Sequence, residues 1–378
     1  MTRFLHTADW QLGLKLRFLD GDRGAKLRLE RFEVVRRLAA AAHEHAVEAV
    51  VVAGDVFDDN AVGAATLQAA RDALAAFAPI PVLLLPGNHD AATPESALRR
   101  LAPEEHGLDH VRPLLVAEPL TIGDTVYYPC PLLRRHTHDD PTRWLPSRQD
   151  GTHEDGDAVR VAIAHGGVLD FGESTESPNL IAAEEVLARG FDYLALGDWH
   201  GLLRFGSAGW GDRVWYSGTP EPTRFEEKEP GRALVVEIDG AGEEPRVEVL
   251  ELARSRWLTE SRTLDGEAAV DELERWLKEL PERSWTLLRL QLDGALSLAQ
   301  RARLDRLLAA AGEELLELRL DDGRLVTEPS EEDLAQLRLE GFVGRAVERL
   351  RKESTREEDG AAAQGALRLL YRLLQEES

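Results

Sequence analysis

Short apolar runs alternate with amphipathic stretches over the first ninety residues of the chain. Residues 3–7, 49–53 and 82–85 are apolar runs that predict strands. Between them, apolar side chains recur at helical spacing over residues 27–45 and 64–77. Strands that are apolar on both faces and alternate with helices are typical of a parallel sheet covered by helices. The pattern predicts an α/β fold.

Further strands follow and extend this first domain to about residue 255. Residues 159–164 and 193–196 are apolar runs that predict strands, and residues 214–220 and 233–238 look like strands that close a second sheet. A long polar stretch at residues 131–156 carries several arginines and is typical of a functional or disordered loop. Its arginines are equally consistent with phosphate contacts and with an ordinary exposed surface.

The remainder of the chain predicts two smaller parts. Over residues 256–328 the pattern predicts a small α+β unit with helices at 268–280 and 298–311 and strands at 285–292 and 315–320. Over residues 329–378, Ser330 is a candidate helix N-cap, and helical periodicity continues through residues 341–351 and 361–374. The last helix carries an apolar stripe that suits an internal core or a partner surface, formed by Leu367, Leu370, Tyr371 and Leu374.

Composition narrows the class of protein. A chain of 378 residues with 43% hydrophobic content exceeds one comfortable core, so we expect two or three domains. Cys130 is the only cysteine, which excludes a disulfide within the chain and a thiolate zinc cluster. The sequence runs straight into a strand without a secretory leader, and no apolar run reaches transmembrane length. We therefore expect a cytoplasmic protein that does not bind a membrane.

The formal net charge is −24, which argues against nucleic-acid binding because such binding draws on clustered lysine and arginine. Bound cations would reverse this locally, since they neutralise carboxylates and attract phosphate. The charge makes DNA a less favoured substrate without excluding it.

Polar clusters stand where predicted strands end, and they carry the chemistry. They are Asp9, Gly54-Asp55, Gly87-Asn88-His89-Asp90, His165 and Gly197-Asp198-Trp199-His200. Carboxylate, amide and imidazole groups from several strands are the ligands of a two-metal hydrolytic site, in which one carboxylate bridges cations about 4 Å apart. Asp55 is the natural bridge. His89 suits the general acid, and Asp90 is a candidate to orient it.

Simpler interpretations exist for each cluster taken singly. The Gly87–Asp90 segment has the composition of a turn, and Asp9 and Asp55 suit helix N-caps. Their joint occurrence at five strand ends favours the metal site. Trp10 and Trp199 flank predicted ligands and suit either base stacking or a packed aromatic wall.

Taken together, five motifs resemble those of the calcineurin-like metallophosphoesterases, and more narrowly those of the Mre11/SbcD group of DNA repair nucleases. The motifs, spread over roughly the first 240 residues, are His6-Thr7-Ala8-Asp9-Trp10-Gln11-Leu12-Gly13, Gly54-Asp55-Val56-Phe57-Asp58, Gly87-Asn88-His89-Asp90, His165-Gly166-Gly167 and Leu196-Gly197-Asp198-Trp199-His200. The resemblance implies a four-layer αββα sandwich over residues 1–255, a small α+β capping domain over 256–328 and a C-terminal helical segment over 329–378. That segment would bind a coiled-coil ATPase of the Rad50/SbcC kind.

The resemblance also implies two divalent cations, Mn²⁺ first, with Mg²⁺ or Fe²⁺ as alternatives. One cation would take Asp9, Gln11, Asp55 and His200, and the other would take Asp55, Asn88, His165 and Asp198. The substrate would be DNA, at ends or in single strands, and a homodimer is left open.

Two residues depart from the family pattern. Gln11 and Asp198 stand where the family usually has histidine, so the ligand set is richer in oxygen and favours hard ions over Zn²⁺. Gln11 suits either direct coordination or a hydrogen bond to a neighbouring ligand. We therefore keep two alternatives to a DNA nuclease in DNA repair: a phosphodiesterase for nucleotides or other small molecules, and a weakly active scaffold that recruits the ATPase.

Overall fold

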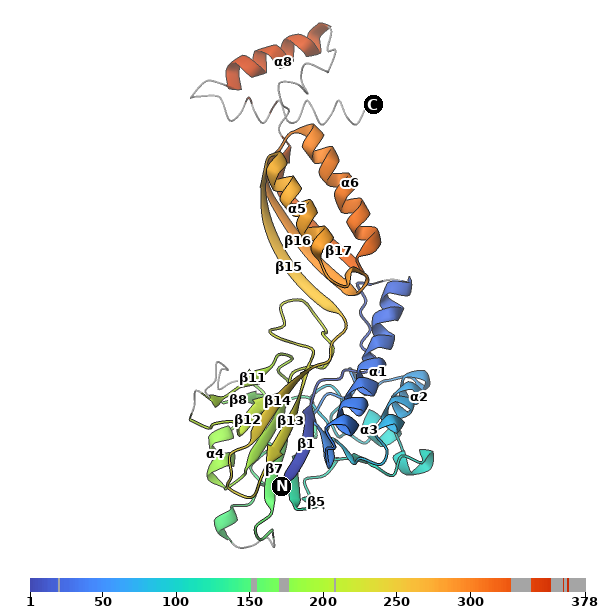
Figure 1. Ribbon diagram of the computed structural model, residues 1–378, viewed down its shortest axis with the longest axis vertical. Helices are drawn as coiled ribbons and strands as arrows, with labels where there is room; N and C mark the ends of the chain where they lie inside the picture. The colour runs from blue at the N-terminus through green and yellow to red at the C-terminus, as the bar shows by residue number, and fades with distance from the viewer. Residues whose placement is uncertain are drawn as a thin grey trace. The chain divides into compact units, whose positions relative to one another are not determined.

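The computed structural model describes residues 1–19, 21–150, 155–169, 177–206, 209–327 and 341–354, together with residues 363 and 366 (Figure 1). The chain divides into two compact units, Met1–Arg256 and Trp257–Ser378. In the part of the chain that is described, no helix combines the length and the apolar character needed to cross a membrane.

The first unit contains two six-stranded sheets. In the first sheet the order is β14-β13-β1-β2-β3-β4, with β1 to β4 parallel and β13 and β14 antiparallel. Its strands are β1 (Thr2–Thr7), β2 (Ala49–Val52), β3 (Val82–Leu84), β4 (Val111–Pro113), β13 (Arg232–Ile238) and β14 (Arg246–Glu251). Residues of β2 and β3 are buried throughout, as expected for parallel strands covered on both faces.

The second sheet has the order β11-β12-β10-β7-β6-β5. Its four central strands are parallel, and β5 and β11 pair antiparallel at the edges. The strands are β5 (Leu120–Ile122), β6 (Thr125–Cys130), β7 (Val159–His165), β10 (Tyr193–Gly197), β11 (Leu203–Arg204) and β12 (Val214–Tyr216). A short pair, β8 (Gly167–Val168) and β9 (Leu180–Ile181), lies apart from both sheets.

Apolar side chains join these sheets into layers. Helices α1 (Gly21–Glu44) and α2 (Ala64–Leu74) pack on the outer face of the first sheet, whereas α3 (Ala97–Arg100) is a single turn. Helix α4 (Ala183–Ala188) packs on the second sheet, and a separate apolar cluster fills the space between the sheets. The order helix, sheet, sheet, helix confirms the predicted αββα sandwich.

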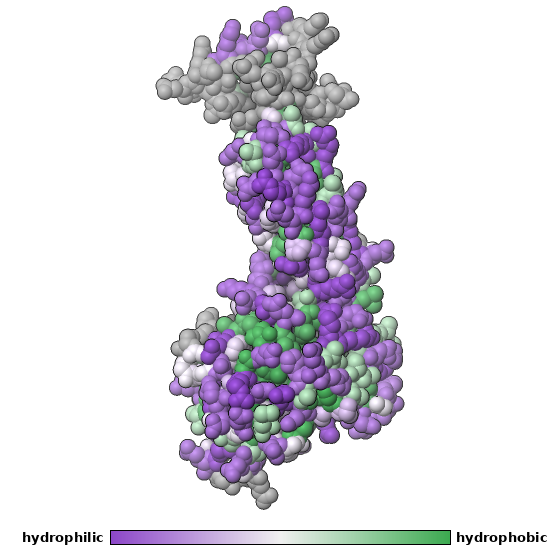
Figure 2. Space-filling model, in the orientation of Figure 1, coloured by the Kyte–Doolittle hydropathy of each residue, from purple (hydrophilic) through white to green (hydrophobic). Residues whose placement is uncertain are grey.

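The second unit is built around one three-stranded sheet with the order β15-β16-β17. Its elements are β15 (Arg256–Asp265), α5 (Glu267–Glu279), β16 (Thr286–Leu296), α6 (Leu298–Glu314) and β17 (Glu317–Thr327). Both helices cover one face of the sheet and bury a shared leucine-rich core (Figure 1). Helix α6 begins with a capping box between Ser297 and Gln300. Figure 2 shows mainly hydrophilic side chains on the visible surface of this unit.

The second unit contains one strand that the sequence did not predict. We expected no strand before the helix at residues 268–280, yet β15 occupies that place; its charged, alternately exposed residues lack a continuous apolar run. Helix α8 (Gly341–Ser354) matches the predicted periodicity at 341–351. The Ser330 cap and the stripe of Leu367, Leu370, Tyr371 and Leu374 lie outside the described residues.

Candidate metal centre

The predicted ligands come from the carboxyl ends of five strands in the two sheets. Strand β1 leads to Asp9 and Gln11, β2 to Asp55, β3 to Asn88, β7 ends on His165, and β10 leads to Asp198 and His200. Carboxyl ends of parallel neighbours meet at one edge of a sheet, and open α/β sheets bind their ligands there. The topology thus gathers side chains that are up to 191 positions apart in the sequence.

The backbone at this edge is unusual. Asp9, Gln11, Asp55 and Asp198 all have positive φ angles, of 53°, 44°, 52° and 103°. Left-handed backbone costs free energy for residues other than glycine and is concentrated at functional sites. It is held here by backbone hydrogen bonds such as Asp9 N–H to Gly54 O at 3.0 Å and Gln11 N–H to Asp55 O at 2.9 Å.

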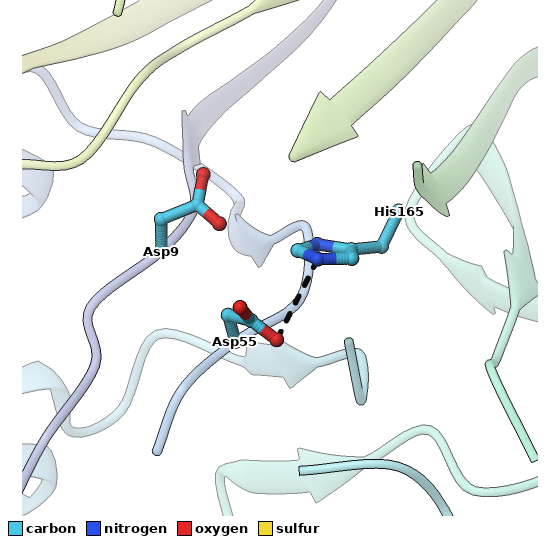
Figure 3. Close-up of side chains that lie close together, drawn as sticks. All are labelled: Asp9, Asp55 and His165. Atoms are coloured by element: carbon cyan, nitrogen blue, oxygen red, sulfur yellow. Dashed lines mark ion pairs between the residues drawn. The ribbon is translucent and has the colours of Figure 1, made fainter. Parts of the chain in front are cut away.

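Asp9, Asp55 and His165 form the centre of the cluster (Figure 3). One ligand atom from each lies within 4.8 Å of the other two, and all three side chains are buried. The imidazole fits because Gly54 and Gly87 lack side chains. A Cβ at Gly54 would lie 2.1 Å from His165 Nδ1, and one at Gly87 would lie 2.2 Å from Asp55 Oδ1.

His165 also faces the ends of other strands. Its Nε2 lies 3.5 Å from Asp55 Oδ1 and 3.6 Å from Asp198 Oδ1, while its Nδ1–H donates to the Ala53 carbonyl at 2.9 Å. Nε2 is therefore the nitrogen that faces the carboxylates, and a cation bound there would take the place of its proton. Both Nε2 and the Asn88 Oδ1 are buried without a hydrogen-bond partner. Buried polar atoms are rarely left unpaired, and imidazole nitrogen and amide oxygen are ligand atoms, so the site fits a divalent cation.

The electrostatics of the cluster also favour a bound cation. Burial raises the pKa of Asp9 to about 6 and the pKa of Asp90 to about 7, and the charge of Asp55 adds to both shifts. Burial by itself would lower the pKa of His165, but the charges of Asp55, Asp198 and Asp9 outweigh it and raise the pKa to about 9. Carboxylates held this close repel one another and attract positive charge. A cation relieves that repulsion.

Gln11 and His200 form the other side of the cluster. Gln11 is 4% exposed, and its Nε2 lies 3.2 Å from His200 Nε2 and 3.5 Å from Asp55 Oδ2. A half-turn of the amide exchanges nitrogen for oxygen at this place, which would present a metal-binding atom. The geometry thus suits both interpretations of Gln11.

Glu227 is a residue of the site that the sequence did not single out. Its Oε1 accepts a hydrogen bond from His200 Nδ1 at 2.7 Å and another from Thr223 Oγ1. The carboxylate–histidine pair fixes the ring so that Nε2 faces the cluster, an arrangement common behind metal-bound histidines. Burial tends to raise the pKa of Glu227, but the His200 contact lowers it overall. No local spacing indicates Glu227, because it lies within a loop and does not follow a predicted strand.

Arg31 is a second residue near the site that the sequence did not single out. This fully buried arginine on α1 donates to the carbonyls of Trp10 and Gln11 and, on the other side, to those of Glu221 and Pro222. It thereby ties the first ligand segment to the loop that carries Glu227. In the sequence it is one charged residue of an amphipathic helix.

The contacts of His89 correct one expectation. The Asp90 carboxylate accepts from the backbone N–H of Gly87 at 2.7 Å and of Phe57 at 3.0 Å, so it holds the turn. His89 Nδ1 instead donates to the carbonyl oxygen of Asp58 at 2.8 Å. The orienting group of His89 is therefore the Asp58 carbonyl and not the Asp90 carboxylate. His89 Nε2 lies 4.0 Å from Asp55 Oδ2 on the partly exposed side of the cluster.

The two tryptophans differ. Trp10 is 1% exposed, stacks on Phe77 with an interplanar angle of 9° and donates to Thr7, so it belongs to the packed wall. Trp199 is 42% exposed. Of the loop arginines, Arg148 serves the fold by donating to Asp192 and to the carbonyls of Gly190 and Ala158.

Comparison with known proteins gives two matches. Residues 2–215 match the family model described as calcineurin-like phosphoesterase. The chain is also similar to the SbcD subunit of the nuclease SbcCD of Bacillus subtilis (strain 168), with 26% identity over 336 residues that cover 80% of this chain and 82% of the relative. The family match covers all the strand ends described above, and of the two six-stranded sheets it leaves out only β13, β14 and the last residue of β12.

Proposed function

The chain belongs to the calcineurin-like phosphoesterases, and from that premise we propose that it is the nuclease subunit of a DNA repair complex that hydrolyses phosphodiester bonds at DNA ends. The observation that carries the proposal is the buried convergence of ligand-type side chains with the unpaired His165 Nε2 and Asn88 Oδ1 at its centre. The similarity to a protein named as part of a nuclease supports DNA as the substrate.

In this proposal two divalent cations are held by overlapping sets of residues. Asp9, Gln11, Asp55 and His200 would hold one, and Asp55, Asn88, His165 and Asp198 would hold the other. When bound, the cations supply a deprotonated water and charge stabilisation at phosphorus. The oxygen-rich ligand set favours Mn²⁺, with Mg²⁺ or Fe²⁺ as alternatives.

His89 is the proposed proton donor to the leaving 3′ oxygen. Its Nδ1–H is committed to the Asp58 carbonyl, so Nε2 is the atom that gives up a proton as the P–O bond breaks. Asp90 would act on catalysis through the turn that carries Asn88 and His89, because it holds the N–H of Gly87. The side chain of His89 is 29% exposed, which leaves it open to a substrate.

The net charge of −24 favours one competing function, a phosphodiesterase for small molecules. End-labelled DNA and bis-p-nitrophenyl phosphate, each with and without Mn²⁺, separate the two. We expect metal-dependent cleavage of DNA. Hydrolysis of the small diester without any cleavage of DNA would establish the competing function. Elemental analysis that finds no bound metal, with neither substrate cut, would indicate a scaffold.

Variants test the assigned residues directly. Asn88→Ala and His89→Gln should abolish hydrolysis while the circular dichroism spectrum stays unchanged, because both side chains lie at the cluster and not in the apolar core. His136→Gln, in an exposed loop position, is the matched control and should retain full activity. Full metal-dependent activity in either cluster variant would refute the assignment.

Partner binding is proposed from the resemblance and from the helical end of the chain. Residues 256–328 would form the capping domain, and residues 329–378, which include α8, would bind a Rad50/SbcC-like ATPase. Co-purification of a coiled-coil ATPase from the same genome with the full chain, but not with a chain ending at residue 328, would support this. Equal capture by both would contradict it.

A further inference from the structure

Trp199 is the large apolar side chain between two predicted ligands, and the metal centre does not use it. It stands between Asp198 and His200, immediately after β10, and 42% of its surface is exposed. Exposing so large an apolar ring to water is unfavourable, and the chain avoids it at Trp10, which is stacked and buried at the same edge. An exposed ring beside a phosphate-binding site suggests a stacking role.

The indole nitrogen of Trp199 lies close to the backbone at Gly201. A Cβ added to Gly201 would lie 3.0 Å from the Trp199 Nε1 and 2.1 Å from the Lys228 carbonyl oxygen. The absence of a side chain at Gly201 thus lets the indole lie close to the loop that carries Glu227. That loop also positions His200 through the Glu227 contact, so the same loop lies beside both Trp199 and His200.

The chemistry around Trp199 favours a nucleobase over other aromatic partners. The metal centre next to it takes a phosphate, and a nucleobase is separated from its phosphate by a single sugar. The same loop carries Arg224, whose side chain is 71% exposed and lies 3.7 Å from Glu227, and the exposed Lys228, which stands between Glu227 and Glu229. These two exposed cations, and not the loop as a whole, suit the flanking phosphates of a nucleic-acid strand.

We propose that Trp199 stacks on the base next to the scissile phosphate and makes the site select phosphodiesters that carry a nucleobase. This specificity role rests on the proposed nuclease function. Stacking on an aromatic side chain is tolerant of sequence, because every base has a π-face. Trp199 would therefore distinguish nucleic acid from simple phosphodiesters without distinguishing one sequence from another.

The test uses the full chain and two single-stranded oligothymidylates. In one the terminal nucleotides are intact, and in the other they are replaced by abasic tetrahydrofuran analogues. Trp199→Ala should lower kcat/KM for the intact strand by about 5- to 150-fold, the usual effect of losing one stacked base, and leave kcat/KM for the abasic strand unchanged. Trp199→Phe should lose less. Leu29→Ala removes another exposed apolar side chain, on α1, and should change neither value.

A second measurement does not depend on turnover. An oligothymidylate with 5-iodouracil at its ends and phosphorothioate terminal linkages is irradiated with the protein, and the cross-linked tryptic peptides are identified by mass spectrometry. The expected cross-link lies in the peptide of residues 190–204, at Trp199. It should be lost in Trp199→Ala and kept in Leu29→Ala.

The outcomes separate this inference from the function on which it rests. Equal losses of kcat/KM on both strands would mean that Trp199 only supports Asp198 and His200, and no loss on either strand, or a cross-link elsewhere, would mean that it does not touch the base. Each of these overturns the stacking role and leaves the nuclease function intact. A wild-type protein that cuts neither strand in Mn²⁺ overturns both.

Discussion

Carboxylates are used in opposite ways in the two units of this protein. In the first unit, Asp9, Asp55 and Asp90 are buried within one cluster, where burial and mutual charge raise the pKa of Asp9 and of Asp90. In the second unit, Glu267, Asp271 and Glu274 surround Arg303 at the surface, where water reaches all of them. The apolar core of that unit consists mostly of leucine.

This difference separates the residues that serve function from those that serve the fold. Buried like charges destabilise the folded chain unless a cation joins them, so such a cluster is maintained for what it binds. Exposed ion pairs contribute little, and the second unit depends on its leucine core for stability. Substitutions in the carboxylate cluster of the first unit should therefore lower activity more than stability. Substitutions in the leucine core of the second unit should lower stability and leave activity unchanged.

The largest expected effect is that of Asp55→Asn. Loss of the shared ligand should lower metal-dependent hydrolysis by at least about 10³-fold. Without metal, the same change removes the repulsion of Asp55 with Asp9 and Asp90, which adds to the effect of burial, but it also removes the attraction of Asp55 to His165. The melting temperature should therefore fall less in the metal-free protein than in the protein with Mn²⁺. Calorimetry with and without Mn²⁺ and an activity assay measure both effects. Near-normal activity, or an equal loss of melting temperature with and without Mn²⁺, would show that Asp55 is not kept for metal binding.

The opposite pattern is expected for Leu304→Ala in the second unit. Leu304 is fully buried on α6, and its truncation should cost about 2–5 kcal/mol of stability. Hydrolysis of bis-p-nitrophenyl phosphate should be unchanged, because the metal centre lies in the first unit. Leu320→Ala, at a position that is 41% exposed, is the control and should cost much less. Equal destabilisation by both changes in urea unfolding would show that this core is not what stabilises the unit.

Acid sensitivity should also belong to the first unit, and His6→Gln tests this. Burial lowers the pKa of His6 from 6.5 to about 3, and its ring contacts Tyr193 OH and Leu196 O. Below pH 6.5 the unfolded chain therefore binds a proton that the folded chain refuses, and stability falls as the pH decreases toward 3. Between pH 6.5 and 4.5 the wild type should lose about 2–3 kcal/mol more than His6→Gln.

Urea unfolding at the two pH values gives this difference directly. A parallel loss of stability in wild type and variant would mean that His6 is not the group that takes up the proton.

The smallest of the four effects concerns Glu227→Gln. Replacing the carboxylate that fixes His200 should weaken Mn²⁺ binding by about 10- to 100-fold and leave the fold intact. Calorimetric titration with Mn²⁺ measures the affinity. Glu229→Gln, at an exposed position of the same loop, controls for the change in net charge. If both variants weaken binding equally, Glu227 acts through long-range charge and not through His200.

Much of the first unit could be predicted because its signals are local. The runs that became β2, β3 and β10 are apolar on both faces, those that became β1 and β7 are apolar in part, and each is followed by or ends in a polar cluster. Strand β15 had no such signal, since charged residues interrupt its apolar positions. The periodicity of the helices α5 and α6 was clear because each has one face in the leucine core.

The site shows the same division. Residue types and strand ends indicated the candidate ligands, but not the hydrogen-bond partner that orients each of them. The partner of His89 is a backbone carbonyl, and any residue offers one, so Asp58 could not be recognised. Glu227 and Arg31 act across contacts between distant segments, which leave no mark on their neighbours in the chain.

The sequence by itself determined the class of fold, the polar clusters and the two unusual members of the ligand set, Gln11 and Asp198, because hydrophobic periodicity and residue chemistry are local properties. Only the tertiary structure decided that Asp90 holds a turn, that Glu227 orients His200, and that Trp10 is packed whereas Trp199 faces water. Burial and hydrogen-bond partners depend on how distant segments meet. That meeting is set by the packing of the two sheets, not by any one stretch of the chain.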